Sequence, residues 1–196
     1  MNTFPLTELE TYINSYFGIQ QAGKLREVSN LFKLTTLKKG DFFLKENGRC
    51  DKLSFIKSGF LRIYALKEGN EITQWISTKG YFITDISGFM FEKPSRWNMQ
   101  ALVDTEIYTI KRSDYNKIQS IEPKWFEFEK MFIVKCFEMV ENRVFSHLSM
   151  NAEERYNAYF DMNNEIFNQV PLQYIASLLG MSPETLSRIR KKQLEI

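Results

Sequence analysis

The residues best suited to binding chemistry lie near the end of the chain. Residues 174–192 read YIASLLGMSPETLSRIRKK, a stretch in which small, apolar and charged residues alternate at helical spacing. Gly180 can take the positive φ of a tight turn, Ser182 is a good N-cap, and Pro183 is a good first residue for a following helix. The stretch therefore predicts two short helices joined by a turn, as in a helix-turn-helix.

The two predicted helices have the contacts that such a pair needs. Ala176 is a small residue at the position where the helices cross, and the inward positions are apolar: Ile175, Leu179, Met181, Leu186 and Ile189. The alternative is an ordinary helical hairpin with a solvated charged face. Because the small residue, turn glycine, cap and apolar positions are all in register, the pattern favours the helix-turn-helix.

The outward face of the second helix has the chemistry of base and phosphate contacts. Arginine can donate two hydrogen bonds to guanine, glutamate can accept from cytosine, and serine can reach base or phosphate. The remaining basic side chains and the helix N-termini can hold phosphates. The predicted DNA-binding residues are Ser182, Pro183, Glu184, Ser187, Arg188, Arg190, Lys191 and Lys192.

The distribution of charge agrees with one polyanion-binding surface on a neutral body. The chain has 196 residues and a formal net charge of +2. Residues 171–196 contain four basic and two acidic residues, so the rest of the chain sums to zero. A local basic cluster of this kind indicates a single surface for a polyanion.

Two kinds of element precede the terminal helices. Apolar residues at helical spacing predict a short helix over residues 6–17, which Gly18 would end. Residues 30–110 then read as many short strands rich in Phe, Ile, Leu and Thr. Turn residues divide these strands at regular intervals, which predicts a barrel, roll or sandwich.

A long helix is predicted over residues 123–150, and it carries two apolar stripes instead of one. The first stripe is Trp125, Phe128, Phe132, Cys136 and Met139, and the second is Ile133, Phe137, Val140, Val144 and Leu148. A surface helix normally needs a single stripe. The second stripe predicts a twofold contact with the same helix of another subunit. The alternative is a helix buried between two parts of one chain.

This order of elements resembles the Crp/Fnr family of bacterial regulators. In the strand region the resemblance rests on KKGDFFLKENG (residues 38–48), FIKSGFLRIY (55–64) and TKGYFITDISGF (78–89). In the terminal helices, ETLSR (184–188) is similar to the E-x-x-S-R signature of the Fnr-type reading helix.

The resemblance implies an α+β fold with three parts. These are a jelly-roll-like antiparallel β-roll for effector sensing with an N-terminal helix (1–122), a dimerisation helix (123–150) and a DNA-binding helix-turn-helix domain (151–196). Since only KKQLEI follows the reading face, we expect this domain to lack the two-stranded wing common in the family.

The resemblance also implies an effector pocket between the strands and the long helix. Its predicted residues are Phe82, Thr84, Asp85, Ser95, Arg96 and Trp97, and other aromatic residues such as Trp75 and Phe89 could line it. The family's cyclic-AMP sites have Gly-Glu before the pocket's short helix and Arg-Ser after it, where this chain has Thr84-Asp85 and Ser95-Arg96. One place on a strand turns a side chain to the other face, so the cyclic phosphate would lose its guanidinium partner. We therefore expect either a small organic effector other than cyclic AMP or no effector.

Composition weighs against other classes of protein. Two cysteines are too few for an iron–sulfur sensor, His147 as the only histidine disfavours haem or a metal-dependent barrel enzyme, and we expect no cofactor and no enzymatic activity. We expect Cys50 in a loop and Cys136 in the core.

The sequence thus predicts a dimeric, cytoplasmic transcription regulator that binds double-stranded DNA and contacts no membrane. RNA polymerase and a small effector are further candidate partners. The alternative is a sensory β-roll whose terminal hairpin docks a protein partner. The effector, the operator, the target genes and the sign of regulation are not readable from the sequence.

Overall fold

A computed structural model of the chain describes residues 5–194. Residues 1–4 and 195–196 lie outside the described residues. The predicted domain bounds 1–122 and 151–196 include them. The fold is α+β, as predicted. No helix within residues 5–194 is both long and apolar enough to cross a bilayer.

The elements follow the predicted order of helix, strands and helices. The N-terminal helices are α1 (Glu8–Phe17) and α2 (Ala22–Ser29). The strands are β1 (Lys33–Leu37), β2 (Phe42–Leu44), β3 (Lys52–Ser58), β4 (Leu61–Lys67), β5 (Asn70–Ser77), β6 (Phe82–Ile83), β7 (Asn98–Ala101) and β8 (Thr105–Lys111), with α3 (Ile86–Phe91) between β6 and β7. The C-terminal helices are α4 (Arg112–Tyr115), α5 (Ile118–Ile121), α6 (Trp125–Ser149), α7 (Ala152–Asn163), α8 (Ile166–Gln169), α9 (Leu172–Leu178) and α10 (Pro183–Leu194).

The strands form a roll of two antiparallel sheets, in the orders β1-β8-β3-β6 and β2-β7-β4-β5. Apolar side chains of the strands, such as Phe55, Ile56 and Ile110, are fully buried in the core of the roll. Gly59 makes the turn from β3 to β4 with φ +92°, and a Cβ there would lie 2.4 Å from Thr105 Oγ1. Only glycine fits such a turn without displacing its neighbour.

Helix α1 confirms the predicted N-terminal helix and its stop. It begins at a capping box in which the Glu10 N–H donates to Thr7 Oγ1 over 3.2 Å and the Thr7 N–H donates to the Glu10 carboxylate over 2.7 Å. It ends at Gly18, which has φ +74° and donates its N–H to the Asn14 carbonyl over 2.8 Å. The helix is thereby fixed against α6, where Phe17 stacks on Phe132 with ring centroids 4.8 Å apart.

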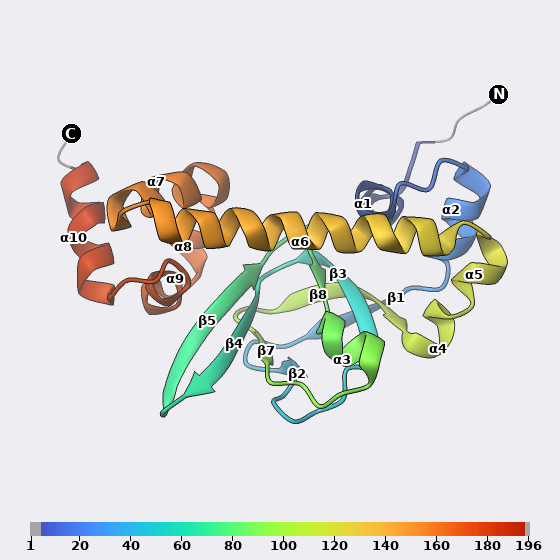
Figure 1. Ribbon diagram of the computed structural model, residues 1–196, viewed down its shortest axis with the longest axis horizontal. Helices are drawn as coiled ribbons and strands as arrows, with labels where there is room; N and C mark the ends of the chain where they lie inside the picture. Colours follow the sequence, from blue (N-terminus) through green and yellow to red (C-terminus); the bar gives the residue numbers. More distant parts are fainter. Residues whose placement is uncertain (1–4, 195–196) are drawn as a thin grey trace.

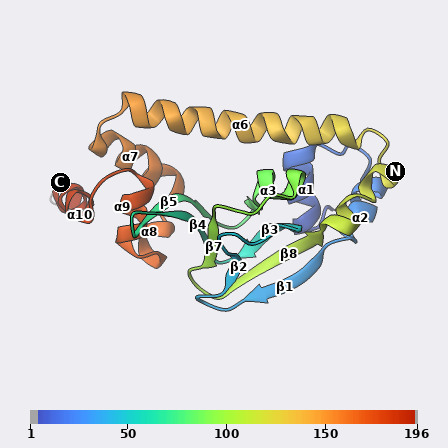
Figure 2. The same ribbon diagram turned by 60° about the horizontal axis from the view of Figure 1, so that its bottom comes forward.

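Helix α6 runs along the whole molecule, from α1 at one end to the C-terminal helices at the other (Figures 1 and 2). Its first apolar stripe packs on the core of the roll, with Trp125 and Phe132 only 3% and 1% exposed. The second stripe is exposed to solvent, from 37% at Ile133 to 82% at Leu148. The two predicted faces are therefore distinct, and only the first is covered by the described part of the chain.

The C-terminal helices rest on the β4–β5 hairpin through a shared core. Phe60, Ile76 and Leu102 of the roll belong to the same buried cluster as Ile175 and Leu178 of α9. Burial of these apolar groups favours contact between the two parts but does not by itself fix their relative orientation.

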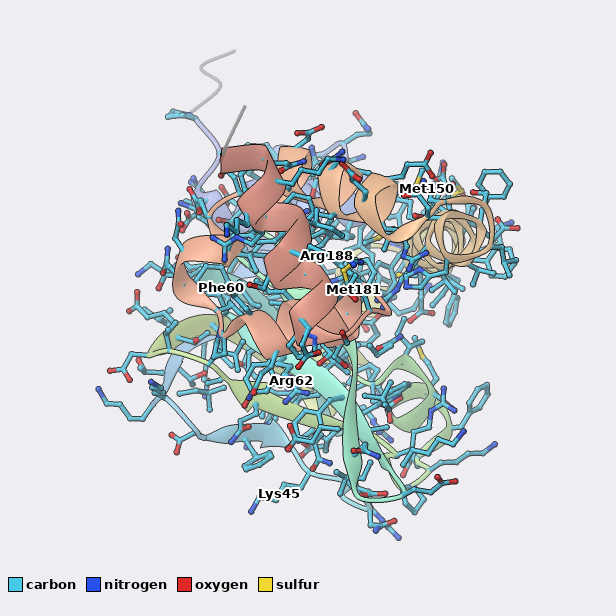
Figure 3. The ribbon with its side chains drawn as sticks, turned by 90° about the vertical axis from the view of Figure 1, so that its left-hand side faces the viewer. Lys45, Phe60, Arg62, Met150, Met181 and Arg188 are labelled. Carbon is cyan, nitrogen blue, oxygen red and sulfur yellow. The ribbon has the colours of Figure 1, made fainter. Side chains whose placement is uncertain are left out.

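Arg62 of β4 supplies a directional contact at this boundary, where Figure 3 places it between the C-terminal helices and the strands. It is 1% exposed. Its guanidinium carbon lies 3.7 Å from the ring centroid of Tyr174 on α9 and 4.3 Å from that of Tyr64. Its Nε donates to Thr73 Oγ1 over 2.8 Å, and the Thr73 N–H donates to Ser177 Oγ of α9 over 2.9 Å. Cation–π and hydrogen-bond geometry thus orient α9 on the hairpin.

Replacing Arg62 should loosen the C-terminal helices from the roll. Arg62→Met keeps much of the side-chain volume but removes the cation between the two rings, a contact worth about 2 kcal/mol when desolvated. We expect the C-terminal helices to unfold before the roll, seen as a split transition in calorimetry and faster hydrogen exchange in α9.

The matched control is Lys67→Met on the same strand, where the native lysine is exposed. It should leave both measurements unchanged. Wild-type unfolding and exchange in Arg62→Met would contradict this role for the arginine.

Candidate functional site

Helices α9 and α10 are joined by the predicted turn at Gly180. The Gly180 N–H donates to the Ser177 carbonyl over 3.2 Å and the Met181 N–H donates to the Ala176 carbonyl over 3.0 Å. With φ +65° at Gly180, these bonds form the Schellman arrangement that ends a helix. His147 of α6 packs on the turn, because a Cβ at Gly180 would lie 3.3 Å from its ring. The positive φ therefore favours glycine at this turn, and a larger residue would also have to displace the His147 ring slightly.

Helix α10 begins where the sequence predicts. Pro183 is its first residue, and the Thr185 N–H donates to Ser182 Oγ over 3.2 Å, which makes Ser182 the N-cap. Ala176 is fully buried at the crossing of the two helices. Among the predicted inward residues, Met181 is half-buried and the others are buried: Ile175, Leu179, Leu186 and Ile189.

The opposite face of α10 is polar and open to solvent at one end of the molecule (Figure 3). The exposed members of the predicted set are Ser182, Pro183, Glu184, Ser187, Arg188, Lys191 and Lys192. A hydrogen bond from its own backbone N–H lowers the pKa of the Glu184 carboxyl, with a further contribution from Ser182. Glu184 is therefore an anionic acceptor near neutral pH, beside donors supplied by Arg188.

The four basic residues of α10 are not equally available. The Lys192 Nζ lies 3.0 Å from the Glu153 carboxylate of α7, and Arg190 is half-buried beside Tyr156. Arg188 and Lys191 make no ion pair with any described residue. Arg188 and Lys191 are thus open to a ligand, whereas Arg190 and Lys192 also hold α10 against α7.

A cavity of about 400 Å³ lies in the roll beneath α6. Five of the six predicted pocket residues line it: Phe82, Thr84, Asp85, Arg96 and Trp97. The sixth, Ser95, is buried beside the cavity, where its Oγ accepts a hydrogen bond from the Trp97 N–H over 3.0 Å. Helix α6 lines one side of the cavity with Cys136, Met139 and Val140.

The polar groups of this cavity are largely committed to the fold. Asp85 is the N-cap of α3, and its Oδ1 accepts from the Gly88 N–H over 3.1 Å. The Thr84 hydroxyl donates to the Lys52 carbonyl over 3.0 Å. Arg96 is exposed, with its guanidinium carbon 4.4 Å from the Trp97 ring centroid. The expectation that Arg96 faces away because of strand alternation is wrong, since residues 95–97 lie in a bend before β7 and Arg96 lines the cavity.

The two cysteines lie in different surroundings. Cys50 lies in a loop, as predicted, and is only 1% exposed, with its Sγ 3.3 Å from the Thr84 hydroxyl. Cys136 is half-buried, and burial raises the pKa of its thiol to about 11, so it is neutral at physiological pH. No group of three or more His, Cys, Asp or Glu residues within residues 5–194 could hold a metal ion.

Sequence reasoning missed Arg62, and it placed the pocket against the long helix without naming the α6 residues that line it. The signal for Arg62 was an arginine inside an otherwise apolar strand, with Glu71 and Thr73 on the next strand. Trp75, named only as a further aromatic, does line the cavity, whereas Phe89 is 4% exposed and belongs to the core.

Comparison with known proteins places this geometry in a recognised class. Residues 34–121 match the family model of the cyclic nucleotide-binding domain. No curated protein matches the sequence at a significant level.

Solved structures match nearly the whole chain. FixK2 from Bradyrhizobium japonicum is 18% identical with a TM-score of 0.71, over 82% of this chain and 83% of that one. The catabolite activator protein of Thermus thermophilus is 19% identical with a TM-score of 0.58, over 92% and 86%. A CooA mutant from Carboxydothermus hydrogenoformans is 18% identical with a TM-score of 0.63, over 98% and 87%.

Residues 34–121 of the roll are thus similar to the cyclic nucleotide-binding domain. With its long helix and terminal helices, the chain shares the fold of FixK2, the catabolite activator protein and CooA, which agrees with the resemblance seen in the sequence. At these identities the structural likeness establishes the fold, and the chemistry must be argued from this chain's own residues.

Proposed function

We propose that the chain is a dimeric regulator of transcription that binds a specific DNA site through a helix-turn-helix formed by α9 and α10. The observation that carries the proposal is the two-sided character of α10. Its inner face is buried on α9, while its first turns present an anionic acceptor, a hydroxyl and the exposed Arg188 to solvent. A capped helix with such an outer face has the donors and acceptors that the major groove requires.

Arg188 should carry more sequence specificity than any other single side chain. It is exposed and lies about one and a half turns into α10, where a guanidinium can reach the groove floor. A bidentate contact to guanine discriminates by about 1–3 kcal/mol, whereas a phosphate contact discriminates by almost nothing. Arg188→Ala should therefore abolish the preference at one position of each half-site. An operator is first obtained by selection from random DNA. Competition binding then compares this operator with its single-base variants.

Lys191→Ala is the matched control, because this lysine is also exposed and unpaired among the described residues. It should weaken binding to all sequences alike and reduce the salt slope by about one unit. Equal losses on specific and random DNA for Arg188→Ala would instead make this residue a phosphate contact and move base reading to Glu184 and Ser187.

The exposed face of α6 supports the dimer. Beside the second stripe it carries further large apolar side chains, with Phe126 at 68% and Phe145 at 69% exposure. Residues spaced along a 25-residue helix form one continuous band, longer than a monomer normally leaves open to water. A second copy of α6 packed on it by a twofold axis would cover the band and place two α10 helices for an inverted repeat.

Charges within this band should convert the dimer to a monomer. Phe137 and Val144 are 62% and 52% exposed, so replacing both with Glu costs little in the single chain but buries two carboxylates per subunit in the dimer. Sedimentation should give a dimer for the wild type and a monomer for Phe137→Glu/Val144→Glu. The control Phe91→Glu, at a residue 69% exposed on α3, should remain dimeric. A monomeric wild type at micromolar concentration would contradict the proposal.

We further propose that the roll cavity takes a small effector other than cyclic AMP. A cyclic phosphate needs a buried guanidinium. The only guanidinium lining this cavity within residues 5–194 is that of Arg96, which is exposed and rests on Trp97. Asp85, the acid nearest the expected ribose position, already caps α3. Val140 lines the cavity and is 49% exposed on the dimer face, so an occupant would touch a residue of the proposed interface.

Calorimetry with cyclic AMP should therefore show no binding at micromolar concentrations. AMP is the control for weak association of the nucleotide itself. Micromolar affinity that Arg96→Ala removes would show instead that Arg96 turns inward around the ligand.

A further inference from the structure

A second cavity, of about 240 Å³, lies where the roll meets α6 and the C-terminal helices. Its walls come from β5, α6, α7 and α9, and Trp75, Tyr81 and Met139 separate it from the roll cavity. Most of the lining is apolar or aromatic and includes Tyr159 and Leu178. We call it the junction cavity.

Arg143 of α6 is the polar group in this cavity whose bonding is incomplete. Its Nη2 donates to the Leu178 carbonyl over 3.0 Å, and its guanidinium carbon lies 5.5 Å from the Trp75 ring centroid. Its Nη1 is buried and has no hydrogen-bond partner among the described residues. A guanidinium always carries its charge, and a buried donor without an acceptor is costly, so this nitrogen needs an acceptor that no described residue provides.

The charges around the junction cavity determine which acceptor fits. Arg143 and Arg155 line it, and no Asp or Glu of the described part of the chain does. Arg155 is already bonded, since its Nε and Nη1 donate to the carbonyls of Leu179 and Met150 over 2.9 and 2.6 Å. It therefore adds positive potential, while Arg143 keeps the free donor. Burial also raises the pKa of Tyr159, which stays a neutral phenol able to donate a hydrogen bond.

We propose that the junction cavity binds a small carboxylate with an apolar ring system. The carboxylate accepts from Arg143 Nη1, and the rings lie among Trp75, Tyr159 and Leu178. The volume is adequate, because an apolar cavity of about 150 Å³ already admits benzene. This site is separate from the roll effector pocket and does not depend on DNA binding.

The position of the junction cavity gives its occupancy a structural consequence. Arg143 already ties α6 to the last turn of α9, and Gly180 follows that turn directly. A ligand that completes the bonding of Arg143 would strengthen the contact between α6 and α9. Its effect should therefore appear first as protection of α9 from hydrogen exchange.

The test uses 2-naphthoate as the probe and its uncharged amide, 2-naphthamide, as the matched ligand. Calorimetry on the full chain should show 2-naphthoate binding about tenfold or more tightly than the amide, because only the carboxylate makes a charge-assisted bond. Arg143→Gln should remove this difference. Lys130→Gln, at an exposed base on the same helix, should leave it intact.

A second variant tests the place of binding. Ala158 lines the junction cavity but not the roll cavity, so Ala158→Leu should block 2-naphthoate by filling the space. Circular dichroism checks that each variant is folded. No binding to the wild type at millimolar probe, equal affinity for acid and amide, or unchanged affinity in folded Arg143→Gln or Ala158→Leu would each overturn the proposal. A DNA-binding assay run in parallel distinguishes failure here from failure of the regulator proposal.

Discussion

The position of α10 depends on one buried contact, that of α9 with the β4–β5 hairpin. The apolar cluster around Phe60 and Ile175 supplies attraction, but apolar contacts tolerate small rotations. Arg62 between Tyr64 and Tyr174 does not, because its charge must face both rings while its Nε bonds Thr73. A buried charge is weak evidence for stability, and its better-attested use is to specify one arrangement over others. In this molecule it specifies how the exposed face of α10 points relative to the roll.

Helix α6 is the second element shared by both halves, and each part of its surface has a different neighbour. Phe132 lies in the roll core, Val140 borders the roll cavity, and Arg143 bonds the end of α9. His147 then packs against the Gly180 turn. The outer face carries the exposed apolar band. Because these contacts follow one another along a single helix, no part of α6 can rotate without changing a cavity or a turn.

The features that were predictable from sequence are those encoded by neighbouring residues. In the terminal helices, the cap, the turn and the buried face are each determined by residues within one or two helical turns, namely Ser182, Gly180 and Leu186. All three features were therefore predictable. The periodic turns of the roll gave its class but not its strand order, since β1 pairs with β8 far along the chain. Arg62 was missed for the same reason: the hairpin meets α9 across 104 residues, from Thr73 to Ser177. Strand alternation does not predict the orientation of Arg96, because this residue lies in a bend before β7.

The length of α6 has a mechanical consequence. Its 25 residues span about 37 Å at 1.5 Å per residue. A tilt of about 10° about one end displaces the other by roughly 6 Å, more than one helical turn of rise. Such a tilt requires only small side-chain adjustments near the pivot. The helix is thus a lever arm between the roll and the terminal helices, because a small change of angle where it packs on α1 becomes a much larger displacement where it meets α9.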